Sequence, residues 1–216
     1  MEIHVAAGVG HGPTELSAFD AALADAGVGD YNLVTVSSVV PADGTVRVVD
    51  RAPDLGPAGG RLTVVRATTT AAPTGTLDPE RPAAPRGAGG ITERVVTNGA
   101  EEHDASSGTA ETTVADTPTP TEPDLVAGLG WATGPGPGLF YEATGDDPAA
   151  VRDRIVRGLE AGGGLRDWDV PERTVTLATA ATEPDAHVAA VVVAAYGGAE
   201  PIATRVGGDD DRTRQV

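Results

Sequence analysis

The chain has no cysteine and no lysine, and each absence removes whole classes of chemistry. Without cysteine there are no disulfides, zinc–thiolate sites, iron–sulfur clusters or cysteine nucleophiles. Pyridoxal-phosphate enzymes hold their cofactor on a lysine, and phosphate-binding loops of the Walker type also need one. An enzyme of this composition that acts on amines through a Schiff base must therefore supply the reactive carbonyl itself.

Aromatic and basic residues are also scarce. Aromatics make up 3% of the 216 residues, so the core must be built mainly from Val, Leu, Ile and Ala. The chain has 15 basic residues, all arginine, and 32 acidic residues, so the formal net charge is −17. A dense acidic surface is typical of a protein adapted to a high-salt cytoplasm, while a GC-rich genome explains the arginines but not the acidic excess. The charge also argues against nucleic acid as a partner.

Nothing in the sequence predicts a membrane or metal protein. No stretch approaches transmembrane length, and residues 1–10 (MEIHVAAGVG) lack the basic and long apolar regions of a signal peptide. We therefore expect a soluble, cytoplasmic protein. The histidines show no ligand spacing, so no metal site is expected. They are His4, His11, His103 and His187.

Hydrophobic periodicity predicts an α+β domain with two helices and about seven strands. One helix is expected at Glu15–Ala26, with Thr14 as N-cap and Gly27 at its end. Another is expected from 148 to about 161, ended by the glycines at 162–164. Strands are expected at 2–7, 31–38, 45–49, 61–66, 125–132, 138–143, 173–180 and 187–195. The last is almost wholly apolar and should be central, with both faces buried.

One domain is expected at 1–206, interrupted at about 67–123. That stretch is rich in Thr, Ala, Pro, Gly and Glu, so we expect a largely disordered, low-complexity insertion. A hairpin at 91–96 stays an open possibility. Residues 207–216 are expected to form an acidic disordered tail.

The glycine-rich run at residues 8–12 follows a predicted strand and precedes a predicted helix, and this order suggests a dinucleotide site. Its spacing does not match G-x-G-x-x-G, and no alternating βαβ series follows. We therefore interpret residues 8–13 as a loop. The sequence also has no G-x-S-x-G nucleophile elbow.

Four runs near the start of the chain carry a resemblance to a known family. They are residues 10–16 (GHGPTEL), 18–23 (AFDAAL), 26–34 (AGVGDYNLV) and 36–41 (VSSVVP). With residues 138–142 (GLFYE), they resemble the pyruvoyl-dependent arginine decarboxylases in order and spacing. The resemblance covers about residues 3–52 and 125–196, and the insertion is the main departure from compact members.

The resemblance implies self-cleavage between Ser37 and Ser38. On pattern alone, this serine pair would more often cap or turn the backbone. In the family, the hydroxyl corresponding to Ser38 attacks the preceding carbonyl, and elimination leaves a covalent pyruvoyl group at that position. The ketone then binds the α-amine of arginine as a Schiff base and withdraws electrons as carbon dioxide leaves. The implied reaction converts L-arginine to agmatine and carbon dioxide, the entry to polyamine-type metabolism.

Three further residues match the family singly. Glu142 matches the glutamate that supplies a proton after decarboxylation, and we expect its side chain to be desolvated. Because it lies far from the cleavage site in sequence, we expect it to act in turnover rather than in maturation. Asp20 matches the aspartate that receives the guanidinium. Asn32 matches the asparagine near the scissile bond, whose amide can hold an oxyanion or the substrate carboxylate. Each residue also has a purely structural interpretation. Glu142 could occupy a solvent-facing strand position, and Asp20 could be an exposed helix carboxylate. Asn32 could be a strand-start residue that bonds its own backbone.

The family fold is a four-layer αββα sandwich that forms homotrimers with active sites between subunits, and the resemblance implies both here. Two alternatives stay open. One is a pyruvoyl decarboxylase for a different amino acid. The other is an unprocessed, non-enzymatic homologue that acts as a binding or scaffold protein.

Overall fold

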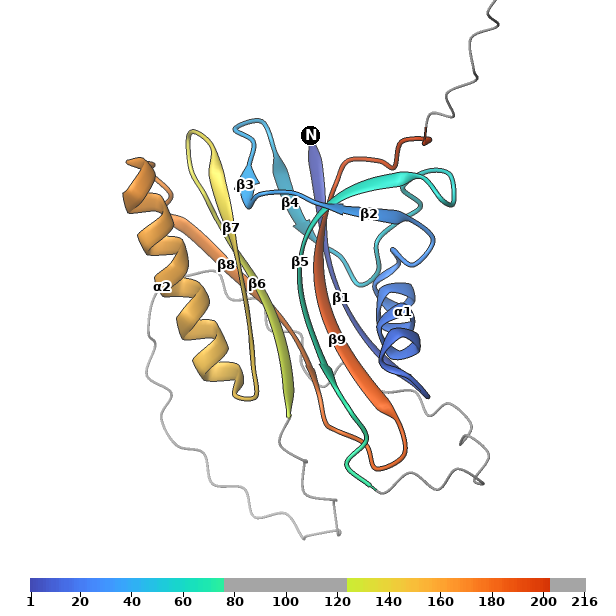
Figure 1. Ribbon diagram of the computed structural model, residues 1–216. Coiled ribbons are helices and arrows are strands. Elements are labelled where there is room, and N and C mark those ends of the chain that lie inside the picture. Colours follow the sequence, from blue (N-terminus) through green and yellow to red (C-terminus); the bar gives the residue numbers. More distant parts are fainter. Residues whose placement is uncertain (76–123, 203–216) are drawn as a thin grey trace, which may run out of the picture.

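The protein folds into four layers, in which two β-sheets lie face to face and one helix covers the outer face of each (Figure 1). The structure is a computed structural model and describes residues 1–75 and 124–202. The sheet orders are β2-β5-β9-β1-β4 and β3-β7-β6-β8. The α+β, four-layer αββα sandwich implied by the resemblance is therefore confirmed. The elements are β1 (Glu2–Gly12), α1 (Glu15–Ala26), β2 (Asn32–Thr35), β3 (Val39–Val40), β4 (Thr45–Val48), β5 (Arg61–Ala71), β6 (Leu125–Thr133), β7 (Gly138–Gly145), α2 (Pro148–Arg166), β8 (Glu172–Ala180) and β9 (His187–Tyr196).

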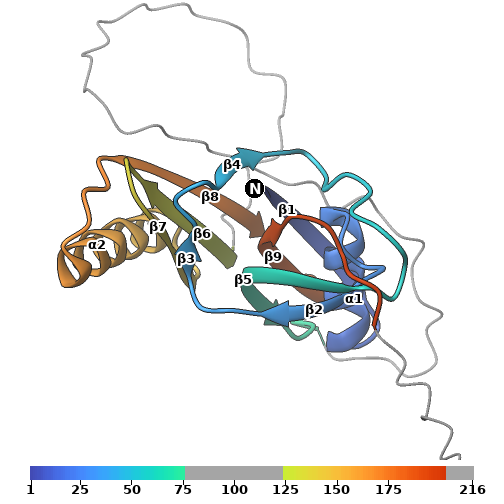
Figure 2. The same cartoon turned by 90° about the horizontal axis from the view of Figure 1, so that it is seen from above.

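Three buried apolar clusters separate the layers, and the view from above shows the helices on opposite sides (Figure 2). The largest cluster fills the space between the sheets, and the others lie beneath α1 and α2. Their members are mostly Val, Leu, Ile and Ala, as the scarcity of aromatics required. Representative members are Val5, Leu129 and Val192 between the sheets, Ala18, Ala22 and Val191 beneath α1, and Ile155, Leu159 and Leu177 beneath α2.

β9 lies at the centre of the five-stranded sheet, as its apolar sequence predicted. It pairs antiparallel with β1 over ten residues and with β5 over eight. Val192 contributes to the cluster between the sheets, whereas Val191 and Val193 contribute to the cluster under α1. Both faces are buried, so an apolar run suits the strand better than strict alternation.

The glycine-rich run is strand and not loop, because β1 continues through Gly12. Gly8, Gly10 and Gly12 face α1, whose backbone packs directly on them. A Cβ at Gly10 would lie 2.2 Å from the backbone nitrogen of Ala22, and one at Gly8 would lie 2.2 Å from the Ala22 carbonyl oxygen. The glycines therefore permit close helix–strand packing, which explains the pattern without a nucleotide.

Helix α1 has the predicted bounds, with a capping box at Thr14 and Gly27 in the left-handed conformation at φ 84°. Helix α2 instead runs to Arg166, beyond the glycines that were expected to end it. A Cβ at Gly162 would lie 2.4 Å from Cδ1 of Leu139 on β7, so this glycine serves close packing rather than termination. β5 likewise extends to Ala71, five residues past its predicted end, because residues 64–71 pair with β9.

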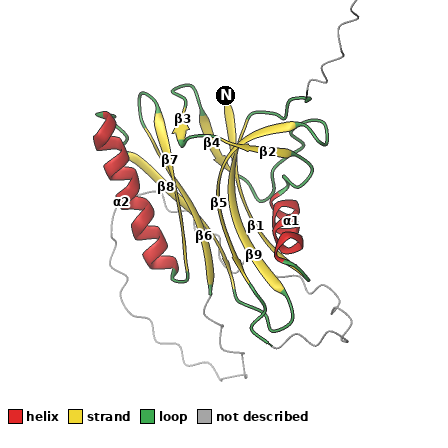
Figure 3. Ribbon diagram, viewed as in Figure 1, coloured by secondary structure: helices red, strands yellow, loops and turns green. Residues whose placement is uncertain are grey.

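The strand predicted at 31–38 ends at Thr35, and the chain then enters the other sheet at Val39 (Figure 3). β2 pairs parallel with β5 in the five-stranded sheet, whereas β3 pairs antiparallel with β7 in the four-stranded sheet. Residues 36–38 form the crossing between them. The Ser37–Ser38 peptide bond therefore lies where the chain passes from one sheet to the other.

Among the described residues, no helix is long and apolar enough to cross a membrane. Three predictions concern residues outside the part of the chain that the structure describes. They are the insertion, apart from residues 67–75, the hairpin at 91–96 and the acidic tail.

Candidate active site

The Ser37–Ser38 segment is held in a defined conformation by backbone hydrogen bonds. The Phe140 N–H donates to the Ser38 carbonyl at 3.0 Å, and the Val39 N–H donates to the Ser37 carbonyl at 2.9 Å. Ser37 is exposed and Ser38 is half-buried. The segment is thus accessible, yet it is fixed to β7 on one side.

Glu142 lies beside the Ser38 hydroxyl. The Ser38 Oγ donates to the two carboxylate oxygens of Glu142 at distances of 3.2 and 3.1 Å. The β3–β7 register explains the contact, because Ser38 bonds Phe140 and Glu142 lies two residues farther along the same face of β7. A carboxylate in this position can take the hydroxyl proton as the oxygen attacks a carbonyl.

Two features of Glu142 differ from expectation. Its side chain is exposed in the single chain, so the described residues do not supply the desolvation that the sequence suggested. Its distance in sequence from the cleavage site suggested a role in turnover alone, yet it contacts Ser38 in the uncut chain. The argument from sequence distance therefore no longer excludes a role in maturation.

Tyr196 at the end of β9 also reaches this segment, and the sequence reasoning did not identify it. Its hydroxyl donates to the Val39 carbonyl at 2.9 Å, and its ring packs edge-on to Phe140 with centroids 6.0 Å apart. Burial raises the pKa of Tyr196 to about 12, and the nearby Glu142 carboxylate contributes. The only signal in the sequence was a tyrosine closing an apolar strand in a chain with 3 tyrosines.

Asn32 and Asp20 are not brought to Ser38 within one chain. Asn32 opens β2, and its Nδ2 donates to the Gly59 carbonyl at 2.6 Å. Asn32 lies six positions before Ser38, and the chain between them is the strand β2 followed by residues 36–38, a span of at most about 20 Å at ~3.3 Å per residue. Asp20 is exposed on α1, the helix outside the five-stranded sheet. One chain therefore assembles Ser37, Ser38 and Glu142, but not the other two predicted residues.

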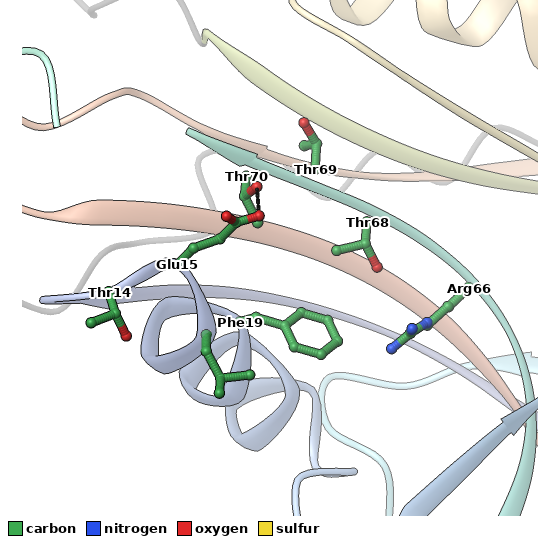
Figure 4. A pocket seen from close by; sticks show the side chains of 8 residues that line it. Thr14, Glu15, Phe19, Arg66, Thr68, Thr69 and Thr70 are labelled. Carbon is green, nitrogen blue, oxygen red and sulfur yellow. Dashed lines mark hydrogen bonds between the residues drawn. The ribbon is translucent and has the colours of Figure 1, made fainter. Parts of the chain in front are cut away.

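A pocket of about 610 Å³ lies between α1 and β5 (Figure 4). The Arg66 guanidinium lies 5.0 Å from the centre of the Phe19 ring, and Glu15 accepts a hydrogen bond from the Thr70 hydroxyl at 2.9 Å. Phe19 is the neighbour of Asp20 on α1. The pocket thus carries one anionic and one cationic side chain, Glu15 and Arg66, whose effects on a charged ligand oppose each other.

The histidines are separate in the structure. His4 lies 3.8 Å from a Glu2 oxygen and His11 lies 3.1 Å from a Glu183 oxygen. Residues 1–75 and 124–202 contain no group of three or more His, Asp or Glu side chains that could hold a metal ion. His103 lies outside these ranges.

Comparison with known proteins adds evidence from sequence similarity, which is independent of this geometry. A family model described as pyruvoyl-dependent arginine decarboxylase matches residues 2–105. Proteins of that name from two strains of Halobacterium salinarum are each 42% identical over 202 residues, covering 93% of this chain and 96% of the relative. A protein of the same name from Methanothermobacter thermautotrophicus is 46% identical over 57 residues, covering 26% of this chain and 36% of the relative.

Proposed function

Because the chain belongs to the pyruvoyl-dependent arginine decarboxylase family, we propose that it cleaves itself at Ser37–Ser38 and then converts L-arginine to agmatine and carbon dioxide. The observation that carries the proposal is the pair of contacts between the Ser38 hydroxyl and the Glu142 carboxylate. A serine hydroxyl on a carboxylate, in an accessible crossing between two sheets, fits the formation of a pyruvoyl group at residue 38.

Maturation begins at the Ser38 hydroxyl. Glu142 accepts the proton while Oγ attacks the Ser37 carbonyl carbon, the new C–O bond forms, and the C–N bond breaks to give an ester and a free amine. Loss of the Ser38 α-proton then breaks the Cβ–Oγ bond and releases the Ser37 carboxylate. Water replaces the nitrogen of the remaining dehydroalanine and ammonia leaves. The products are a chain of residues 1–37 and a chain that begins with the pyruvoyl group.

In turnover, the pyruvoyl carbonyl supplies an electron sink for the bond that loses carbon dioxide. The protein must then hold the substrate and return a proton to its α-carbon. Glu142 lies next to residue 38 and is the proposed proton donor. Asp20 is the proposed partner of the guanidinium, and Asn32 is proposed to bind an oxyanion or the substrate carboxylate.

The proposal includes a homotrimer in which a neighbouring subunit supplies Asp20 and Asn32. Neither residue reaches Ser38 in its own chain, so a complete site needs a second copy. Apolar side chains are exposed close to both: Leu16 on α1 is 67% exposed, and Val34 in the edge strand β2 and Val36 just after it are 40% and 37% exposed. Such side chains next to functional polar residues support a subunit interface there.

The remaining features of the proposal concern setting and domain organisation. A net charge of −17 and similarity to a protein of a halophile support function at high salt, and we place the protein in the cytoplasm. We propose a single domain at 1–206 with an insertion that catalysis does not require. Because β5 extends to Ala71, the test is replacement of residues 76–123 by a short Gly/Ser linker. The shortened protein should still cleave and decarboxylate at high salt, and a folded variant that does neither would refute this.

A denaturing gel of purified protein, with Ser38→Ala beside it, tests self-cleavage. We expect two chains from the wild type and one intact, inactive chain from Ser38→Ala. Ser37→Ala is the matched control, because it keeps both the attacked carbonyl and the attacking hydroxyl and should still be cut. Two fragments from Ser38→Ala would refute the assignment.

Carbon dioxide release from each amino acid then tests the substrate. Arginine should exceed lysine, ornithine and histidine. Preference for one of these would indicate a pyruvoyl decarboxylase of different specificity, and an uncut wild-type chain would indicate a non-enzymatic homologue. Family membership favours neither alternative.

A further inference from the structure

We propose that the backbone N–H of Val39 stabilises the oxyanion during self-cleavage, and that Tyr196 is the positioning residue that holds this N–H in place. The proposal rests on the proposed cleavage at Ser37–Ser38 and deepens it. It assigns to residues of the same chain a role that Asn32 was expected to fill.

The Ser37 carbonyl is the group under attack, and negative charge develops on its oxygen. That oxygen already accepts the Val39 N–H at 2.9 Å in the uncut chain. A donor in place before the reaction stabilises the developing charge without reorganisation. The Asn32 amide is instead bonded to Gly59 at the far end of β2. The Val39 N–H is therefore the donor that one chain places on the reacting carbonyl.

The peptide unit between Ser38 and Val39 is fixed from the side of β7. In a trans peptide the C=O and N–H groups point in opposite directions. The Phe140 N–H holds the Ser38 carbonyl at 3.0 Å, which turns the Val39 N–H away from β7 and toward Ser37. Val39 pairs with Leu139 at a non-hydrogen-bonded position of the antiparallel ladder, so its N–H is free of β7 and is directed at the scissile carbonyl.

Tyr196 fixes the next peptide unit from the opposite sheet. β3 is only two residues long and lies at a sheet edge, so it constrains Val39 weakly. The Tyr196 hydroxyl holds the Val39 carbonyl at 2.9 Å, while its half-buried ring packs against Phe140. With a pKa raised to about 12, the phenol stays protonated and remains a donor throughout the working pH range. Tyr196 thus links the two sheets directly behind the cleavage site.

The rate of cleavage in Tyr196→Phe tests the role of the hydroxyl. Full-length chains made by cell-free synthesis at high salt would be followed over time on denaturing gels. We expect cleavage to slow by about 10- to 100-fold, the usual effect of misplacing a catalytic group. The factor should be constant between about pH 6 and 9, because tyrosine does not ionise there.

Tyr31→Phe is the matched control. Its hydroxyl also bonds the backbone, accepting the Leu55 N–H at 2.9 Å, but far from Ser38 in the fold. This variant should cleave at the wild-type rate. Wild-type cleavage by Tyr196→Phe, or equal slowing of both variants, would overturn the assignment of Tyr196. If the wild-type chain itself stayed intact, the proposed function would fail and not only this inference.

Hydroxylamine, which cleaves esters, separates the two steps of maturation. If Tyr196 promotes the attack that forms the ester, hydroxylamine should release no additional fragment from Tyr196→Phe. An ester that accumulates in this variant would instead place the defect in elimination and refute the oxyanion role. Val39→Pro removes the N–H itself without removing a bond to β7, and it tests the donor even if Tyr196→Phe does not fold. Cleavage of Val39→Pro at the wild-type rate would overturn the proposal.

Discussion

Replacing Glu142 by glutamine asks whether one carboxylate serves both maturation and turnover. The amide keeps the size of the side chain and one acceptor oxygen, so the hydrogen bond from Ser38 can persist. It cannot take the hydroxyl proton, which the carboxylate oxygens at 3.1 and 3.2 Å are placed to do. Only the proton transfer is therefore lost.

The expected magnitude follows from the exposure of Glu142. General acid–base catalysis contributes roughly 10²- to 10⁴-fold, and a carboxylate interacts more weakly with a developing charge in water than in a site that excludes water. Because Glu142 is exposed in the single chain, we expect its loss to slow self-cleavage by about 10²-fold, or ~2.7 kcal/mol in activation free energy. Decarboxylation by protein that has finished cleaving should fall by at least as much, because a subunit interface would shield the site.

Both rates can be measured on the same preparation. Cleavage is followed on denaturing gels, and carbon dioxide release from arginine is measured after the gel shows complete processing. Glu172→Gln is the matched control, since the Glu172 carboxylate accepts a hydrogen bond from the Thr133 hydroxyl at 3.3 Å at the start of β8. If Glu142→Gln cleaved as fast as the wild type and only decarboxylated slowly, Glu142 would act in turnover alone. Equal slowing by Glu172→Gln would show an effect of net charge.

Three further substitutions test the fold and the substrate site. Gly10→Ala forces a Cβ to within 2.2 Å of the Ala22 backbone and should lower the free energy of unfolding by about 3 kcal/mol; a stability equal to wild type in chemical denaturation would contradict the described packing. Asp20→Asn should leave cleavage intact and raise KM for arginine about 10- to 100-fold, the effect of losing ~1.5–3 kcal/mol from a charged hydrogen bond; an unchanged KM would remove Asp20 from the site. Hydrogen bonds from the Thr182 hydroxyl and, to a lesser extent, from the Thr182 N–H lower the pKa of Asp124. The stability that these bonds contribute is therefore present above about pH 4 and is lost as the pH falls through the folded-state pKa of Asp124. Asp124→Asn should weaken the acid dependence of thermal unfolding, and an unchanged profile would count against the contact.

Local signals in the sequence predicted the elements whose ends are determined by their own residues. Helix α1 begins at its Thr14 cap and ends at Gly27, because cap chemistry acts over a few residues. β9 was correctly placed at the sheet centre, because only burial on both faces accommodates its eight consecutive Val and Ala residues, 188–195. In both cases the deciding interactions are visible within a short window of sequence.

The glycines misled the prediction because their purpose depends on distant neighbours. Gly10 and Gly162 resemble a loop and a helix end, yet each permits close packing of another element. The change of sheet between Thr35 and Val39 was missed for a similar reason, since alternation does not say which strand lies alongside. Within the candidate site, Ser38 and Glu142 came from family resemblance. Tyr196 was missed because 157 residues separate it from Val39.

The position of β1 has a consequence for how a cut chain would come apart. β1 lies between β9 and β4, and α1 packs on it, so residues 1–37 include an interior strand and one outer layer. In the uncut precursor, residues 1–37 stay covalently attached, so the separation of this segment from the rest of the fold is a first-order process. After cleavage at Ser37–Ser38, loss of that segment becomes a dissociation, and the reverse step is second order. The midpoint of thermal unfolding should therefore depend on protein concentration after processing. The Ser38→Ala precursor shows how much of this dependence is due to subunit assembly, and the processed protein should show more.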